Sequence, residues 1–126
     1  GDTIYDKNLV NNSKNVDVLF HESMSLDLVN LINKNAQRIG NTMAAKVTID
    51  IQDYHTPILE VVQAAKEANV GHLVFYHHLP APRNQLMENV MYRGVDKIMQ
   101  NWTASHDGTM VVLPLDSDDI IVTSVD

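Results

Sequence analysis

Residues 55–78, HTPILEVVQAAKEANVGHLVFYHH, join a helix pattern directly to a strand pattern. Thr56 can cap a helix, and Pro57 suits the first helical position, where the N–H that proline lacks would have no partner. An apolar stripe at helical spacing follows, and Asn69-Val70-Gly71 ends it. The apolar run 73–76 is typical of a strand that is covered on both faces. These residues therefore predict half of a β-α-β crossover.

Polar residues follow the ends of two predicted strands. The run from Val16 to Phe20 predicts a buried strand that ends at His21-Glu22-Ser23, and the second strand ends at His77-His78. Ligands of open α/β sheets bind outside the carboxyl ends of the strands. We therefore expect the polar residues after Phe20 and after Tyr76 to share one rim of the sheet.

The rest of the chain continues the alternation of strands and helices. Ser25 can cap a helix that Gly40 ends, and the segment 43–53 favours a helix over a strand.

After a proline loop, a helix is expected over 84–100, with Leu86 facing inward and Gly94 interrupting it. Asp107-Gly108 marks a turn before two short terminal strands, 110–113 and 120–122. The pattern predicts an α/β fold in a single domain.

Composition limits the classes of function. With 126 residues and 44% hydrophobic content, the chain is long enough for one domain with a core. The net charge of −7 makes nucleic acid and anionic membrane unlikely partners for this surface, because both are bound mainly through Lys and Arg. No apolar run approaches the ~18 residues of a membrane span, so we expect a soluble chain, in the cytoplasm or the periplasm. Homo-oligomerisation stays open.

Metal-ligand residue types stand at several of the predicted element ends. The chain has no cysteine, so a transition metal would need histidine and carboxylate ligands. The candidates are Asp2, His21, Glu22, His55 and His77. Taken singly, each has a simpler explanation, such as a turn aspartate or a structural histidine.

The order of these motifs carries more information than any one of them. Gly1-Asp2-Thr3 is followed by a strand that leads into His21-Glu22, by His55-Thr56 at the start of a helix, and by Leu-Val-Phe-Tyr-His before a proline loop. This order resembles the C-terminal half of metallo-β-lactamase-fold hydrolases. The similarity is greatest to the branch of arylsulfatase-like enzymes and the tRNA 3′-processing endonuclease RNase Z. It implies that residues 1–126 form half of a four-layered αββα sandwich.

The resemblance also implies a role for each candidate residue. Asp2 matches the aspartate that bridges two zinc ions, and His77 matches the last histidine ligand. Glu22 and His55 match a pair that does not bind metal directly and that either supports the metal ligands or donates a proton, and His21 matches the other position of the His-Glu motif. Mn²⁺ or Fe²⁺ could occupy the same ligands as Zn²⁺. The implied reaction is attack of a metal-bound hydroxide on an ester.

Departures from the endonuclease pattern favour small esters as substrates. Ser23-Met24 stands where the endonuclease has alanine and threonine, Thr56-Pro57 where it has serine, and His78 where the family usually has an apolar residue. The leading expectation is therefore a dinuclear zinc hydrolase of sulfate or phosphate esters. A phosphodiesterase, either a tRNA 3′-processing endonuclease or a cyclic-nucleotide enzyme, is the first alternative. A non-catalytic α/β binding or assembly module is the second.

The remaining metal ligands of this family lie upstream of Gly-Asp-Thr. They form a His-x-His-x-Asp-His motif and one further histidine, and none of them occurs in this chain. A catalytic zinc ion ordinarily takes three protein ligands, so Asp2 and His77 cannot hold two zinc ions alone. We therefore expect a partner, the N-terminal half that carries these ligands, and an isolated chain that is inactive.

Overall fold

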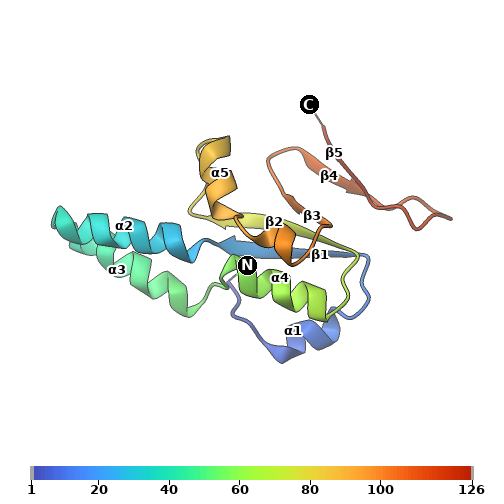
Figure 1. Cartoon of the computed structure of the whole chain (residues 1–126), viewed down its shortest axis with the longest axis horizontal. Coiled ribbons are helices and arrows are strands. Elements are labelled where there is room, and N and C mark those ends of the chain that lie inside the picture. Colours follow the sequence, from blue (N-terminus) through green and yellow to red (C-terminus); the bar gives the residue numbers. More distant parts are fainter. Residues whose placement is uncertain (1, 126) are drawn as a thin grey trace.

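A three-stranded parallel sheet forms the centre of the molecule in the computed structural model, which describes residues 2–125 (Figure 1). Gly1, the first residue of the Gly-Asp-Thr motif, lies outside the described residues. The strands β1 (Val18–Met24), β2 (His72–Leu79) and β3 (Trp102–Ala104) lie in the order β1-β2-β3. The predicted α/β fold is confirmed, whereas the four-layered sandwich stays a prediction.

Helices and a separate hairpin complete the described part of the chain. The α-helices are α1 (Lys7–Asn12), α2 (Leu26–Arg38), α3 (Thr42–Asp50), α4 (Ile58–Glu67) and α5 (Gln85–Met91), and the 3₁₀ turns are η1 (Ile51–Asp53) and η2 (Val95–Lys97). Strands β4 (Thr109–Val112) and β5 (Ile121–Ser124) confirm the two predicted terminal strands to within two residues at each end, and they pair antiparallel. None of the helices in residues 2–125 combines the length and the apolar character that a membrane crossing requires.

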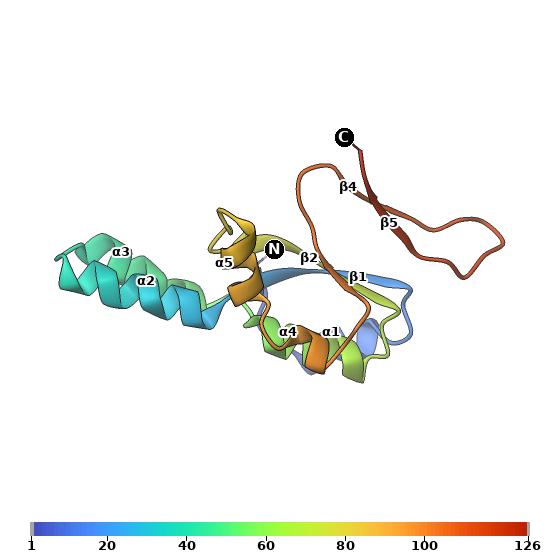
Figure 2. The ribbon, with the colours of Figure 1, turned by 45° about the horizontal axis from the view of Figure 1, so that its top comes forward.

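The crossover predicted from residues 55–78 is present, and it builds the core. Helices α1 and α4 and the turn η2 lie on the same side of the sheet (Figure 2). Val61, Val62 and Ala65 of α4 belong to one buried cluster with Leu73 and Phe75 of β2. Burial of each valine, leucine and phenylalanine among them contributes roughly 1.5–3 kcal/mol to folding.

Both ends of α4 show how the local sequence shapes the helix. At its end Asn69 adopts a left-handed φ of 55°, and the N–H groups of Asn69 and Val70 donate to the carbonyls of Lys66 and Ala65 at 3.1 and 3.0 Å. This pair of bonds satisfies carbonyls that the last turn leaves open. At its start, Pro57 and not Thr56 occupies the cap position. The predicted cap was therefore wrong by one residue, because the Thr56 hydroxyl bonds instead to the carbonyl of Thr3.

Strand β1 differs from its prediction in both limits. It begins at Val18 and continues through His21, Glu22 and Ser23 to Met24, whereas we expected it to end at Phe20. Its second half is the buried half. The strand continues because β2 pairs with it along its whole length, so that the backbone of these polar residues remains satisfied. For the same reason His77 and His78 lie within β2 and not after it.

The segment after the proline loop departs most from expectation. Helix α5 ends at Met91, not at residue 100, because Gly94 adopts a left-handed φ of 96° that an α-helix cannot contain. The turn η2 follows, and then strand β3, which the sequence did not predict. Leu86, expected to face inward, is 73% exposed.

Helices α2 and α3 form an antiparallel hairpin that extends beyond the end of the sheet (Figures 1 and 2). Helix α2 begins after Ser25 and ends before Gly40, as predicted, and a helix also forms in the ambiguous segment 43–53. The hairpin lies between β1 and α4 in the chain, so the crossover contains three helices in place of one.

Candidate functional site

Glu22 lies at the centre of the candidate site, and its carboxylate is fully engaged. The side chain is buried within β1. Its Oε1 accepts the backbone N–H groups of Thr3 and Thr56 at 3.0 and 3.3 Å, and its Oε2 accepts from Nδ1 of His55. A buried carboxylate is stable only when its oxygens are satisfied in this way. Glu22 therefore acts as an anchor for two separate segments of the chain.

The contact with Glu22 decides which nitrogen of His55 faces the site. A carboxylate can only accept, so Nδ1 of His55 carries the hydrogen that Glu22 binds. Nε2 is left to face outward, and it lies 3.8 Å from Oδ1 of Asp2. His55 itself is buried and lies just before α4 in the chain. Its imidazole is thus oriented with one nitrogen available for proton transfer.

Thr3 and Thr56 hold the start of the chain against α4. The hydroxyl of Thr56 donates to the carbonyl of Thr3 at 2.5 Å, while the N–H of Thr3 donates to Glu22. These two bonds place the exposed Asp2 beside His55. The sequence analysis missed this role of Thr3 and Thr56, because no local pattern indicates that residues 53 positions apart are bonded.

A β-bulge brings His77 to the same place. Glu22 pairs with Tyr76 and Ser23 pairs with His78, so His77 has no residue opposite it in β1, and its φ is 47°. A bulge of this kind re-aims a side chain next to a functional site. Nδ1 of His77 lies 3.7 Å from Oε2 of Glu22, and its ring meets that of His55 edge-on at 5.4 Å.

Four of the five candidate residues therefore lie together. Asp2, Glu22, His55 and His77 each offer a ligand atom, and these atoms lie within 4.8 Å of one another. Asp2 and His77 are exposed, whereas Glu22 and His55 are buried and bonded to each other. Carboxylate oxygen and imidazole nitrogen are zinc ligands, so the donor set fits the metal by chemical type.

His21 is the candidate that lies outside this group. Its Nδ1 donates to the backbone carbonyl of Glu22 at 2.9 Å, and its buried Nε2 has no hydrogen-bond partner in the described part of the chain. Neighbouring side chains of a strand point to opposite faces, which separates His21 from the Glu22 carboxylate. Burial lowers the pKa of His21, so its ring is neutral around pH 7.

His78 forms a polar network that the sequence analysis did not anticipate. Its Nε2 donates to the carbonyl of Ser105 at 2.7 Å, so its Nδ1 must accept, and the hydroxyl of Tyr92 lies 2.5 Å from it. Ser23 bonds to both His78 and Tyr92 at 2.9 Å. Burial raises the pKa of Tyr92, which keeps its hydroxyl protonated as a donor. The network holds β2 in place immediately after the bulge. In the sequence, the pair His77-His78 is the only sign of this network.

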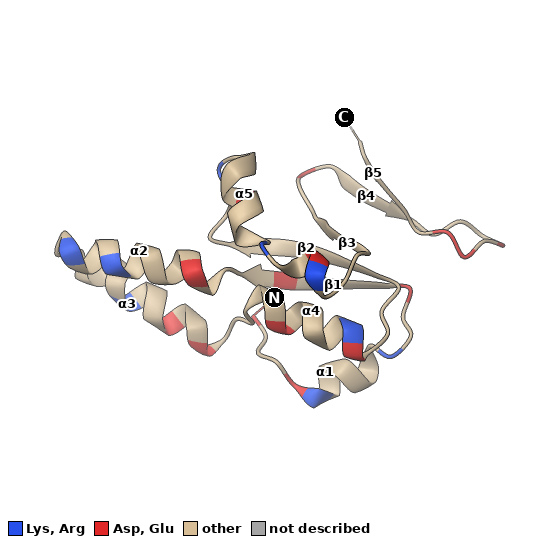
Figure 3. Cartoon of the chain, viewed as in Figure 1, with Lys and Arg blue, Asp and Glu red and all other residues tan. Residues whose placement is uncertain are grey.

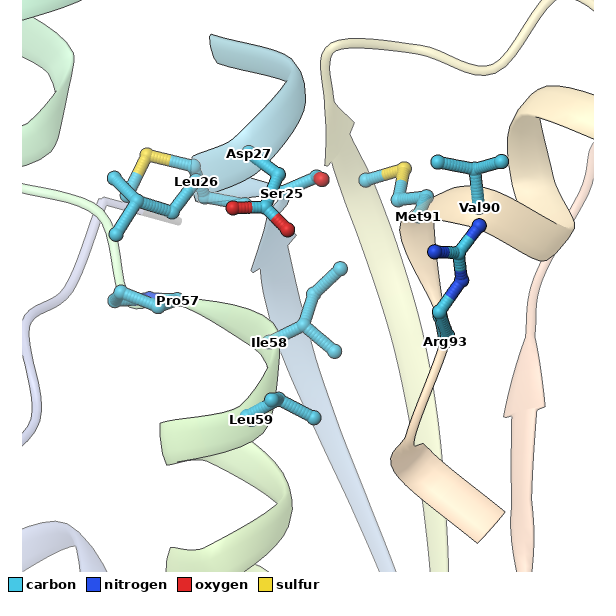
Figure 4. Close-up of a pocket in the computed structure, with 10 residues that line it drawn as sticks. Ser25, Leu26, Asp27, Pro57, Ile58, Leu59, Val90, Met91 and Arg93 are labelled. Carbon is cyan, nitrogen blue, oxygen red and sulfur yellow. The ribbon is translucent and has the colours of Figure 1, made fainter. Parts of the chain in front are cut away.

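Two hollows lie near the ends of the strands. The first, of about 340 Å³, adjoins the site and is lined by Tyr76, His77, His78, Ala81, Pro82, Ser105, His106 and Asp107. The second, of about 250 Å³, lies between the starts of α2 and α4 and the end of α5, with Asp27 and Arg93 on opposite sides (Figure 4). The second hollow contains none of the four clustered residues, so the first is the candidate substrate pocket.

Comparison of the chain with protein-family models and with curated proteins gave no match. The case for a function therefore rests on the cluster of Asp2, Glu22, His55 and His77 and on the hollow beside it.

Proposed function

We propose that the chain forms part of a dinuclear zinc-dependent hydrolase of sulfate or phosphate esters. The observation that carries the proposal is the buried Glu22–His55 pair, whose free nitrogen faces outward between the exposed side chains of Asp2 and His77. A proton donor beside two potential metal ligands is an arrangement that supports metal-dependent hydrolysis of esters with poor leaving groups.

Asp2 and His77 are the residues that would hold zinc. Both side chains are exposed, and neither is engaged as Glu22 and His55 are. Bound zinc would supply a Lewis acid and lower the pKa of water. Because a catalytic zinc ion takes about three protein ligands, we propose that the others come from a histidine-rich half outside this chain.

His55 would act as the general acid. Glu22 holds Nδ1, so the proton for the leaving group would be carried on Nε2, which faces the site. The carboxylate of Glu22 stabilises the imidazolium form that must exist before the proton is donated. Thr3 and Thr56 keep Glu22 in place, and they orient the acid without touching the substrate.

The hollow beside His77 supports a small substrate. Its volume is about 340 Å³, which suits a small aryl ester, and Tyr76 contributes an aromatic ring to its wall. Ala81 and Pro82 supply apolar surface to the same hollow. A phosphodiester would use the same acid and ligands, so the substrate panel in the test must include one.

The test compares esters whose leaving groups differ in basicity. Wild-type protein, isolated with any polypeptide that accompanies it, is assayed on aryl sulfates, aryl phosphates and an aryl phosphodiester. His55→Ala should slow esters with poor leaving groups by about 10²–10⁴-fold and activated aryl esters much less, because only the former need a proton.

His72, at the start of β2 and outside both the cluster and the hollow, provides the matched control His72→Ala, which should keep its rates. Equal slowing of all esters by His55→Ala would remove His55 from the acid role. Absence of hydrolysis of every ester by zinc-loaded wild-type protein would overturn the proposal.

A further inference from the structure

We propose that the α2–α3 hairpin is a self-association surface, through which two copies of the chain pair as an antiparallel four-helix bundle. The seam between the two helices is small and polar. Val29 and Ala36 of α2 are buried, and Nδ2 of Asn33 donates to the carbonyl of Ala45 at 2.7 Å and to Oγ1 of Thr48 at 2.8 Å. These residues define the direction in which each helix faces the other.

One face of the hairpin is apolar and uncovered. Ile32 stands one position before the seam residue Asn33 in α2, and Val47 stands one position before Thr48 in α3. In two antiparallel helices that face each other across a seam, residues one position before a seam residue lie on the same face of the helix pair. Ile39 lies seven residues after Ile32, and Met43 lies four residues before Val47, so both continue the same face towards the tip of the hairpin. Their exposed fractions are 70% and 78%. We call Ile32, Ile39, Met43 and Val47 the apolar face, and all four are exposed.

The opposite face of the hairpin is polar apart from Ile49, and its polar side chains are hydrogen-bonded within the hairpin. Asn30 and Gln37 each stand one position after a seam residue of α2. Asn30 accepts a hydrogen bond from Gln52 at 3.4 Å, and Gln37 donates to Asn33 at 2.7 Å. Exposed apolar side chains gathered on one side of an element mark an interaction surface, whereas single exposed ones do not. The difference between the faces therefore points to a docked partner on the apolar side.

Charge along α2 identifies a second copy as that partner. Asp27 lies at the end of α2 next to the sheet, whereas Lys34 and Arg38 lie towards the tip (Figure 3). Asp27 and Arg38 lie three helical turns apart on the outer edge of α2, beside the apolar face. Antiparallel pairing about a two-fold axis therefore brings Arg38 of each copy to the same edge of the bundle as Asp27 of the other. Pairing with both tips together would bring the basic residues against each other. Four antiparallel helices also bury both apolar faces in one core.

The test measures the mass of the protein in solution. Sedimentation equilibrium of the wild-type chain should give about twice 14.1 kDa at micromolar concentration. Val47→Glu should raise the dimer dissociation constant by at least about tenfold, because it buries an unpaired charge in the apolar face. Ile49→Glu is the matched control: Ile49 is 55% exposed against 51% for Val47, and it lies on the polar face. Its dissociation constant should stay that of wild type.

A charge exchange tests the antiparallel arrangement. Arg38→Glu alone should weaken the dimer, and Asp27→Lys combined with Arg38→Glu should restore it. Circular dichroism of each variant checks that the helices are retained. A monomeric wild-type protein, or equal weakening by Val47→Glu and Ile49→Glu, would overturn the proposal, and failure of the double exchange to restore the dimer would overturn the antiparallel pairing.

Discussion

At the scale of single residues, the buried and half-buried histidines differ in how many of their ring nitrogens have a hydrogen-bond partner. Nδ1 of His55 is bonded to Glu22, and both nitrogens of His78 have partners, whereas Nε2 of His21 has none in the described chain. Burial disfavours the charged form of an imidazole, and it lowers the pKa of the buried His21 and of the half-buried His72. These two residues make the stability of the fold sensitive to mild acid.

The sign of this dependence follows from proton binding. Below the ordinary pKa of 6.5, the unfolded chain takes up protons that His21 resists in the folded state. The contribution of His21 is therefore fully present above pH 6.5 and declines as the pH falls below it. We expect the free energy of unfolding, measured with urea at several values from pH 8 to pH 5.5, to fall less steeply in His21→Phe than in wild type. Identical slopes would show that His21 does not titrate in this way.

At the scale of elements, local signals predicted well and distant contacts did not. The end of α4 was predicted because Asn69 and Gly71 directly follow the stripe. The full length of β1 was not predicted, because residues 21–24 remain in the strand only through pairing with β2, which lies about fifty positions away in the sequence. The bulge at His77 arises from the same pairing, so the sequence supplied the residue but not its geometry.

A close approach of two elements offers a test at this scale. A Cβ on Gly71 would lie 2.6 Å from the backbone carbonyl oxygen of Asp17, where β2 begins beside β1. Backbone cannot move aside as a side chain can, so Gly71→Ala should lower the free energy of unfolding by about 1–3 kcal/mol. Gly40 serves as the control, because its φ of 73° suits asparagine and no atom lies within 4 Å of an added Cβ. Gly40→Asn should change stability by less than about 1 kcal/mol, and an equally stable Gly71→Ala protein would contradict the close packing of these strands.

At the scale of the whole molecule, the sheet is covered unequally. Helices α1 and α4 and the turn η2 cover one face, while Phe20, on the other side of β1 from the core residue Leu19, is exposed (Figure 2). A partner half that completes an αββα sandwich would cover such a face, and the same half is proposed to bring the other metal ligands. The candidate residues could be chosen from the sequence because residue type and order were informative. The way these residues come together in space could not be predicted, because it depends on the hydrogen bonds of Thr3 and Thr56 and on the bulge at His77.

The zinc content of the intact protein, isolated with any accompanying polypeptide and dialysed against metal-free buffer, tests the central claim most directly. We expect about two zinc ions per site in wild type, a loss of zinc in both Asp2→Ala and His77→Ala, and wild-type content in His106→Ala. Wild-type protein that retains no zinc, or unchanged zinc in both Asp2→Ala and His77→Ala, would contradict the assignment of this site.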